Sequence, residues 1–182
     1  KRVPMLTTIT GHAIEIDAAP SPSLMLYCWR AFEADPLRSM LLADTTAFVS
    51  AQHFLNAVGT SIVPFLACVD GKPAALAWLY DIAMLPPKMT PLSAFVAVYV
   101  LPAFRGEHLV RQCAEAFLDQ VRKYGTAHLW AEVRCDNLPS QYALRACGFE
   151  KVATVPSWKR YAGAWQDMKL YHLPLAYIAE TS

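Results

Sequence analysis

An arginine–glycine pair stands between a hydrophobic segment and a predicted helix in the stretch VYVLPAFRGEHLVR, residues 98–111. A strand–turn–helix junction of this kind leaves unpaired backbone N–H groups at the helix N-terminus, and such groups attract anions, phosphates especially. Arg105 and Arg111 would add charge-assisted hydrogen bonds. An ordinary connection with two solvated arginines explains the same residues equally well, so this segment alone leaves the choice open.

A glutamate lies within a second segment, HLWAEVRCDN at residues 128–137. Leu129 and Ala131 alternate with Trp130 and Glu132 along a predicted strand, so Glu132 shares a face with Trp130. If this face lines a cleft, desolvation would make the carboxylate a base suited to deprotonating an ammonium. The alternative is a solvated glutamate on the outer face of an amphipathic strand.

Together the two segments resemble the GNAT superfamily of acetyl-CoA-dependent N-acetyltransferases. The shared features are Val100-x-Pro102-x-x-Arg105-Gly106 at a strand–helix junction, then a strand, Asn137, and a short helix that ends at Gly148-Phe149. The stretch LWAEVRCDN at residues 129–137 is similar to the alanine N-acetyltransferases that modify ribosomal proteins. The resemblance implies acetyl-CoA as the cofactor, no metal, and an acceptor that is an amine-bearing small molecule or a protein N-terminus.

The resemblance also implies roles for individual residues. The acceptor amine attacks the thioester directly in a ternary complex, and Glu132 is the general base, acting through water. Asn137 bonds the pantetheine side of the cofactor. The remaining cofactor-binding residues are the main chain of Val98, Tyr99 and Val100 for the pantetheine arm, and Arg105, Gly106, Glu107, His108, Leu109, Val110 and Arg111 for the pyrophosphate.

Three positions depart from the family pattern. His108 stands where the family prefers glycine, and Val110 stands where it prefers glycine or alanine. Leu144 stands where the family has a tyrosine that protonates the leaving thiolate. Tyr142 lies ~200° from Leu144 around a helix and is expected to face the other way. These departures keep open a second interpretation, a catalytically degenerate GNAT-fold module that binds CoA or another protein. The same residues are equally consistent with an acyltransferase that uses a longer acyl-CoA.

The order of the elements that must position these residues predicts a mixed sheet with helices on its faces. The resemblance implies that this is an α/β (α+β) fold of the GNAT type, with a mixed, mostly antiparallel central sheet flanked by helices, in a single domain over residues 1–182. Asp70-Gly71 predicts a tight hairpin turn, Asp35-Pro36 a helix break, and three prolines a stiff loop around residues 83–93. The expected strands are 13–16, 62–69, 74–82, 94–100, 128–133, 149–155 and 168–175, and the expected helices lie within 23–58, 109–124 and 139–147.

Composition excludes several classes of protein. A net charge of +1 argues against nucleic acid as the main partner. The longest apolar stretch, residues 92–104, is too short to span a membrane. Five cysteines without a C-x-x-C spacing predict neither a metal site nor a disulfide framework, and together with the absence of a signal-peptide pattern they favour a reducing cytoplasm.

Trp158, Tyr161 and Trp165 are expected between the last two strands, as surface-loop aromatics that favour a homodimer.

Overall fold

The computed structural model describes residues 6–7, 11–38, 50–85 and 90–175. Within them, eight strands form one sheet in the order β1-β2-β3-β4-β5-β6-β8-β7. Every neighbouring pair is antiparallel except β5 and β6, so the sheet is mixed and mostly antiparallel, as predicted. The strands are β1 (Leu6–Thr7), β2 (Ala13–Asp17), β3 (Val63–Val69), β4 (Lys72–Leu85), β5 (Thr90–Val100), β6 (His128–Arg134), β7 (Glu150–Tyr161) and β8 (Ala164–Pro174).

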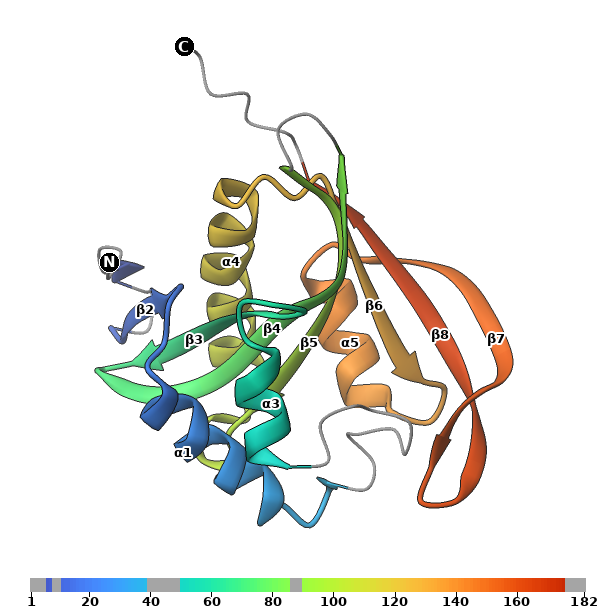
Figure 1. The fold of residues 1–182 in the computed structure, drawn as a ribbon, viewed down its shortest axis with the longest axis horizontal. Helices are drawn as coiled ribbons and strands as arrows, with labels where there is room; N and C mark the ends of the chain where they lie inside the picture. The colour runs from blue at the N-terminus through green and yellow to red at the C-terminus, as the bar shows by residue number, and fades with distance from the viewer. Residues whose placement is uncertain (1–5, 8–10, 39–49, 86–89, 176–182) are drawn as a thin grey trace.

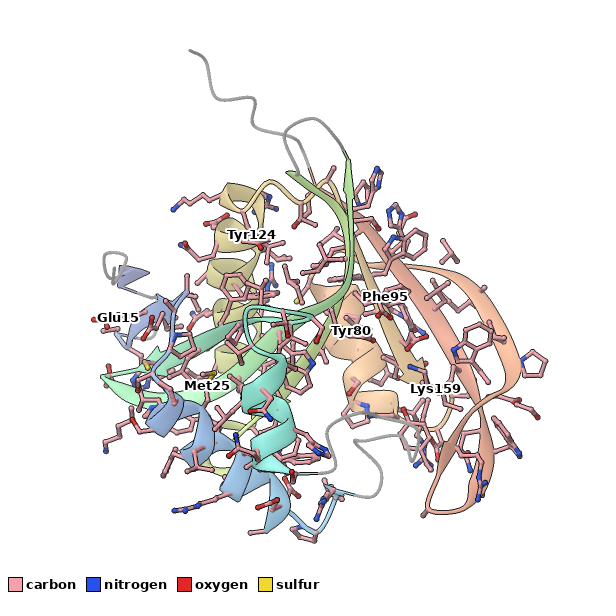
Figure 2. All side chains as sticks on the ribbon, viewed as in Figure 1. Glu15, Met25, Tyr80, Phe95, Tyr124 and Lys159 are labelled. Atoms are coloured by element: carbon pink, nitrogen blue, oxygen red, sulfur yellow. The ribbon has the colours of Figure 1, made fainter. Side chains whose placement is uncertain are left out.

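Helices cover both faces of this sheet (Figure 1). The helices are α1 (Pro22–Glu33), α3 (Ala51–Ala57), α4 (Glu107–Lys123) and α5 (Leu138–Ala146), with a short 3₁₀ turn η1 (Pro102–Phe104) between β5 and α4. Met25 of α1 and Phe54 of α3 pack with Trp78 on one face, whereas Phe117 of α4 packs with Phe65 on the other. Figure 2 shows the described side chains on the ribbon, with Met25 of α1 labelled. No helix in the described ranges is long and apolar enough to cross a membrane.

The local turn signals are confirmed. Asp70 and Gly71 have φ of 50° and 74° and join β3 to β4. Positive φ at both central residues is the type I′ geometry whose twist matches that of antiparallel strands, and glycine adopts it without strain. Helix α1 ends at Glu33, just before the predicted break at Asp35-Pro36. Residues 39–49, the middle of the expected helical segment 23–58, lie outside the described residues.

Two predictions on the extent of loops are wrong. The proline loop expected around residues 83–93 is mostly strand, because β4 continues to Leu85 and β5 begins at Thr90. Pro91 pairs with Met84 where the register is irregular, the kind of place in a sheet that tolerates proline. The remaining loop positions, 86–89, are not among the described residues.

The second correction concerns the aromatic residues near the C-terminus. Trp158 and Tyr161 lie within β7 and Trp165 lies within β8, because these strands continue to a two-residue turn at Ala162-Gly163. Both turn residues have positive φ, of 48° and 80°. Trp158 and Trp165 are exposed, but Tyr161 is buried.

A buried carboxylate joins the end of α1 to the start of α4. The Asp35 side chain accepts hydrogen bonds from the Leu37 backbone N–H at 2.9 Å and the Tyr99 hydroxyl at 3.0 Å, and it forms an ion pair with Arg105. Only 1% of this side chain is exposed. Burial acts to raise the pKa of Asp35, but the hydrogen bonds from Leu37, Arg105 and Tyr99 outweigh it and lower the pKa. Burial of the phenol, and next the neighbouring Asp35 carboxylate, raise the pKa of Tyr99 to about 12.

Replacing Asp35 tests this junction. We expect Asp35→Ala to lower the free energy of unfolding by about 1.5–3 kcal/mol, because it leaves the Arg105 guanidinium and the Tyr99 hydroxyl without their shared acceptor. Tyr99→Phe removes only one neutral donor and should cost about 1 kcal/mol. Denaturant unfolding measures both values. Equal losses from the two variants would contradict the central place given to the carboxylate.

The same carboxylate predicts an acid dependence of stability. Because folding lowers the pKa of Asp35, its stabilisation is complete above the unfolded value of about 3.9 and is lost as the pH falls through the folded value. Asp35→Asn should therefore lose less stability than the wild type between pH 5 and pH 2, measured by thermal melting. Parallel losses over this range would contradict the assignment.

Candidate functional site

The parallel strands β5 and β6 pair over a short distance and then separate. Their register runs only from Ser93 opposite His128 to Phe95 opposite Trp130. Beyond Phe95, β5 stays paired with β4 as far as Val100, but among the described residues none of β6 pairs with it. The backbone N–H and C=O groups of Val96–Val100 that do not bond to β4 therefore face a gap between two strands instead of a strand partner.

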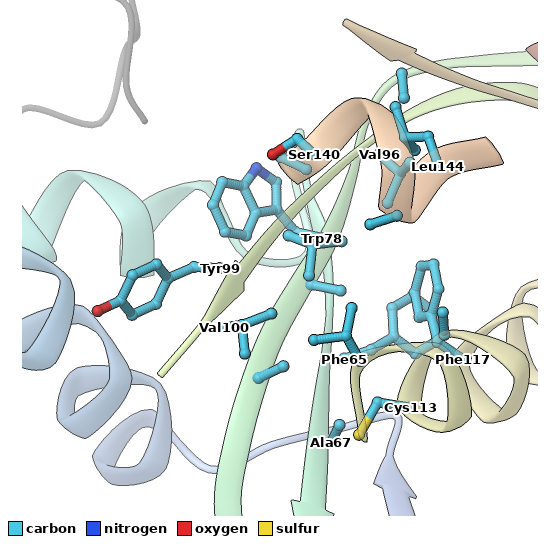
Figure 3. A pocket seen from close by; sticks show the side chains of 18 of the residues that line it. Phe65, Ala67, Trp78, Val96, Tyr99, Val100, Cys113, Phe117, Ser140 and Leu144 are labelled. Carbon is cyan, nitrogen blue, oxygen red and sulfur yellow. The ribbon is translucent and has the colours of Figure 1, made fainter. Parts of the chain in front are cut away.

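A cavity of about 910 Å³ opens at this separation. Figure 3 shows Leu144 of α5 across this space from Phe117 of α4. The lining of the cavity comes mainly from helices α4 and α5 and strands β3 to β7. The lining residues that the following argument uses are Val98, Val100, Leu109, Val110, Asn137, Ser140, Leu144, Tyr80, Asp81, Glu132, Lys159 and Tyr161.

The N-terminus of α4 is open to an approaching ligand. Gly106 caps the helix with a φ of 168°, which is extended backbone that any residue adopts, and a Cβ added there would meet no heavy atom within 4 Å. The fold therefore does not require glycine at this position. The absence of a side chain leaves the backbone N–H groups of the first helical turn accessible.

The predicted cofactor residues of this turn differ in how they are placed. Leu109 and Val110 are partly buried and line the cavity. Arg111 is exposed and forms an ion pair with Glu115 at 3.1 Å. The side chains of Glu107 and His108 lie outside the described part of the chain.

Protein groups hold the side chain of Arg105. Its guanidinium forms the ion pair with Asp35, and its Nε donates to the Val100 carbonyl at 3.2 Å. The guanidinium carbon lies 5.8 Å from the centre of the Tyr99 ring. The Arg105 side chain could contact a phosphate only by leaving Asp35. The backbone N–H groups that follow Arg105 could still bind a phosphate.

Asn137 caps helix α5. Its Oδ1 accepts a hydrogen bond from the Ser140 backbone N–H at 3.2 Å, which satisfies one of the donors that a helix start leaves unpaired. The buried Gln141 holds the preceding turn by donating from Nε2 to the carbonyls of Arg134 and Cys135 at 3.1 and 2.9 Å. The Asn137 amide nitrogen makes no hydrogen bond within the described ranges, so it is available as a donor at the cavity wall.

Glu132 also lines the cavity, and its carboxylate is shared by three donors. Its Oε1 accepts from the Trp158 indole N–H at 3.0 Å, and its Oε2 accepts from the Tyr80 hydroxyl at 3.4 Å and pairs with the Lys159 ammonium. The side chain is 12% exposed. Tyr80 comes from β4 and Lys159 from β7, and both are labelled in Figure 2. Burial and the charge of Glu132 raise the pKa of Tyr80, and they raise that of nearby Tyr161 to about 12.

A bulge in β7 delivers Trp158 and Lys159 to this carboxylate. Val155 pairs with Met168 and Lys159 pairs with Gln166, so β7 advances by four residues between these pairs while β8 advances by two. Ser157 has a φ of 47°, and its backbone N–H donates to the Asp167 carboxylate at 2.9 Å. Bulges bend a strand and redirect its side chains, which explains how two residues of an edge strand reach Glu132.

Comparison with known proteins agrees with this arrangement. The profile of the acetyltransferase (GNAT) family matches residues 26–149, more than half of the chain. The chain belongs to the GNAT family. A search of curated protein sequences found no match.

Solved structures share the fold of this GNAT chain at low sequence identity. RimJ of Mycobacterium smegmatis in complex with CoA-disulfide is 16% identical, with a TM-score of 0.74 over 99% of this chain and 90% of its own. The ribosomal-protein-S5-alanine acetyltransferase of Vibrio fischeri is 14% identical, with a TM-score of 0.73 over 91% and 96%. The protein yncA of Salmonella typhimurium with its cofactor acetyl-CoA is 18% identical, with a TM-score of 0.67 over 93% and 98%.

Helix α5 lacks the GNAT tyrosine but carries a hydroxyl one turn away. Leu144 is partly buried against the core, and Tyr142 faces away from it with 64% of its surface exposed, as the helical spacing predicted. Ser140 lines the cavity and lies four residues before Leu144, on the same helical face. The sequence analysis missed Ser140, although the i, i+4 spacing from Leu144 could have identified it. It also missed Tyr80 and Lys159, for which no local signal exists.

Asn137 offers a test that separates helix capping from other roles. We expect Asn137→Ala to destabilise the chain by about 1 kcal/mol, whereas Asn137→Ser keeps a capping oxygen and should change stability little. Thermal melting of both variants measures the difference. Equal destabilisation would mean that the fold depends on the amide nitrogen and not on the cap.

Proposed function

We propose that this GNAT chain, acting as a single domain over residues 1–182, is a cytoplasmic enzyme that transfers an acetyl group from acetyl-CoA to an amine by direct attack. The observation that carries the proposal is the separation of β5 from β6, with Glu132 beside it and the open N-terminus of α4 at its other end. Membership of an acetyltransferase family supports the same reaction.

The chemistry of the residues around the strand separation supports acetyl-CoA as the cofactor. The backbone of Val98–Val100 would bond the pantetheine amides, because these groups lie along the gap where a neighbouring strand is missing. The first-turn N–H groups of α4 would bind the pyrophosphate at the open face of Gly106. The Asn137 amide nitrogen would donate to the pantetheine arm. Acetyl-CoA, when bound, supplies an activated acyl thioester.

Glu132 is the proposed general base. It lies two residues beyond the last β5–β6 pair, so it borders the point where the strands separate. Trp158 holds Oε1, which leaves Oε2 to accept the proton of the acceptor ammonium once Lys159 moves aside. The exposed Asp81 adds negative charge to the same cavity, and its φ of 48° at the β4 bulge fixes the backbone there.

Ser140 is the proposed source of the proton for the leaving thiolate, since Leu144 cannot donate one. Its position one turn along α5 places a hydroxyl on the cavity wall. The exposed Tyr142 has no access to this space within the described structure. Among acceptors, a protein N-terminus has the support of fold relatives named as ribosomal-protein acetyltransferases.

Cofactor binding is tested by ligand-induced stabilisation. At a concentration 100 times its Kd, acetyl-CoA should stabilise the wild type by about 2.7 kcal/mol, which raises Tm at about 2–4 °C per kcal/mol. Gly106→Leu should melt near the wild type without ligand, because the added side chain enters open space, and should lose the shift because it fills the approach to α4. A wild type that shows no shift with millimolar acetyl-CoA would favour the interaction-module interpretation.

The role of Glu132 is tested with Glu132→Gln, which preserves size and hydrogen bonding. With peptide acceptors that carry a free N-terminus, we expect the acetyl-CoA-induced Tm shift to remain and turnover to fall about 10²–10⁴-fold. The deficit should shrink as the pH rises, because the amine then loses its proton without help. A pH-independent deficit would contradict a base function.

A further inference from the structure

The ammonium of Lys159 occupies the place that the proposed mechanism gives to an acceptor amine. It contacts Oε2 of Glu132, the oxygen that Trp158 leaves available, and it lies in the same cavity as the proposed cofactor-binding residues. The side chain is 28% exposed, so it is enclosed more than a free surface lysine but still borders open space. The protein thus carries its own primary amine beside its proposed base.

This placement depends on specific local structure. Lys159 is the first residue that pairs with β8 after the bulge, and the left-handed Ser157 that shapes the bulge is held by Asp167. The adjacent Trp158 is anchored to the same carboxylate. These contacts direct Lys159 toward Glu132, whereas a lysine on a regular edge strand would extend into solvent without them.

Other lysines of the described structure lack this environment. Lys151 lies earlier on β7 and is exposed. Lys169 of β8 donates to Gln141 Oε1 at 2.6 Å and lines no part of the cavity. Lys151 therefore provides a matched control, since it belongs to the same strand and carries the same amine outside the cavity.

We propose that Lys159 is a self-acetylation site of this enzyme, an inference that rests on the proposed acetyl transfer. Glu132 takes a proton from the Lys159 ammonium, and the resulting amine attacks the thioester carbonyl of acetyl-CoA. A C–N bond forms and the C–S bond breaks. The second proton of the nitrogen passes to the leaving thiolate through Ser140 or solvent, so CoA leaves as a thiol, Ser140 keeps its hydroxyl, and Glu132 releases the first proton to solvent. The product is an amide without charge, so the ion pair with Glu132 is lost while the hydrogen bonds from Trp158 and Tyr80 remain.

The test is incubation of the full chain with acetyl-CoA in the absence of any acceptor, followed by peptide mass mapping. Acetylation should accumulate at Lys159 well ahead of Lys151. Glu132→Gln should slow it by about 10²–10⁴-fold near neutral pH, and Lys159→Arg should abolish it while keeping the charge beside Glu132. Lys151→Arg should leave acetylation of Lys159 unchanged.

Melting with and without acetyl-CoA is measured on the same samples, so that the two proposals can fail separately. A Tm shift with no acetylation of Lys159, or with equal acetylation of Lys159 and Lys151, would overturn the self-acetylation site and leave the proposed function standing. The absence of both the shift and the acetylation would overturn the two together. Acetylation of Lys159 at the full rate in Glu132→Gln would also overturn the inference, because the reaction would then not depend on Glu132.

Discussion

The separation of β5 from β6 is the constraint on which the rest of the site depends. Two parallel neighbours that pair over only three residues leave β5 without a strand partner on one side from Val96 onward, and peptide groups need hydrogen-bond partners. The helices do not fill the gap: residues of α4 and α5 line the cavity, and Gly106 at the start of α4 faces open space. An extended ligand rich in amides would satisfy these groups, which gives a physical reason for the cavity to bind the pantetheine arm of a cofactor.

The reactive side of the cavity depends on a part of the chain that the family match does not include. The match ends at residue 149, whereas Trp158 and Lys159 come from the β7–β8 hairpin that follows. The family match therefore does not cover the residues that surround the proposed base. At the start of α4, Asp35 ties the end of α1 to Arg105, so a buried ion pair fixes the loop that leads into α4 while Gly106 still faces open space.

Local signals in the sequence predicted local structure well. The turn at Asp70-Gly71, the break at Asp35-Pro36 and the opposite orientations of Tyr142 and Leu144 follow from properties of a few neighbouring residues, and the structure confirms them. The β7 bulge and the partner of Arg105, which is 70 positions away, depend on contacts between distant segments and could not be read from any window of sequence. Family resemblance predicted a cofactor-binding segment as a whole, but it could not indicate that the fold itself uses the side chain of Arg105.

Amide hydrogen exchange with and without acetyl-CoA tests the central claim most directly, because it reports on the unpaired backbone groups themselves. If the cofactor takes the place of a strand partner, the Val96–Val100 amides that do not bond to β4 should gain strong protection together with the first-turn amides of α4. The β3–β4 turn at Asp70-Gly71, remote from the gap, should be unchanged. Binding that leaves the exchange of Val96–Val100 unaltered would contradict the account.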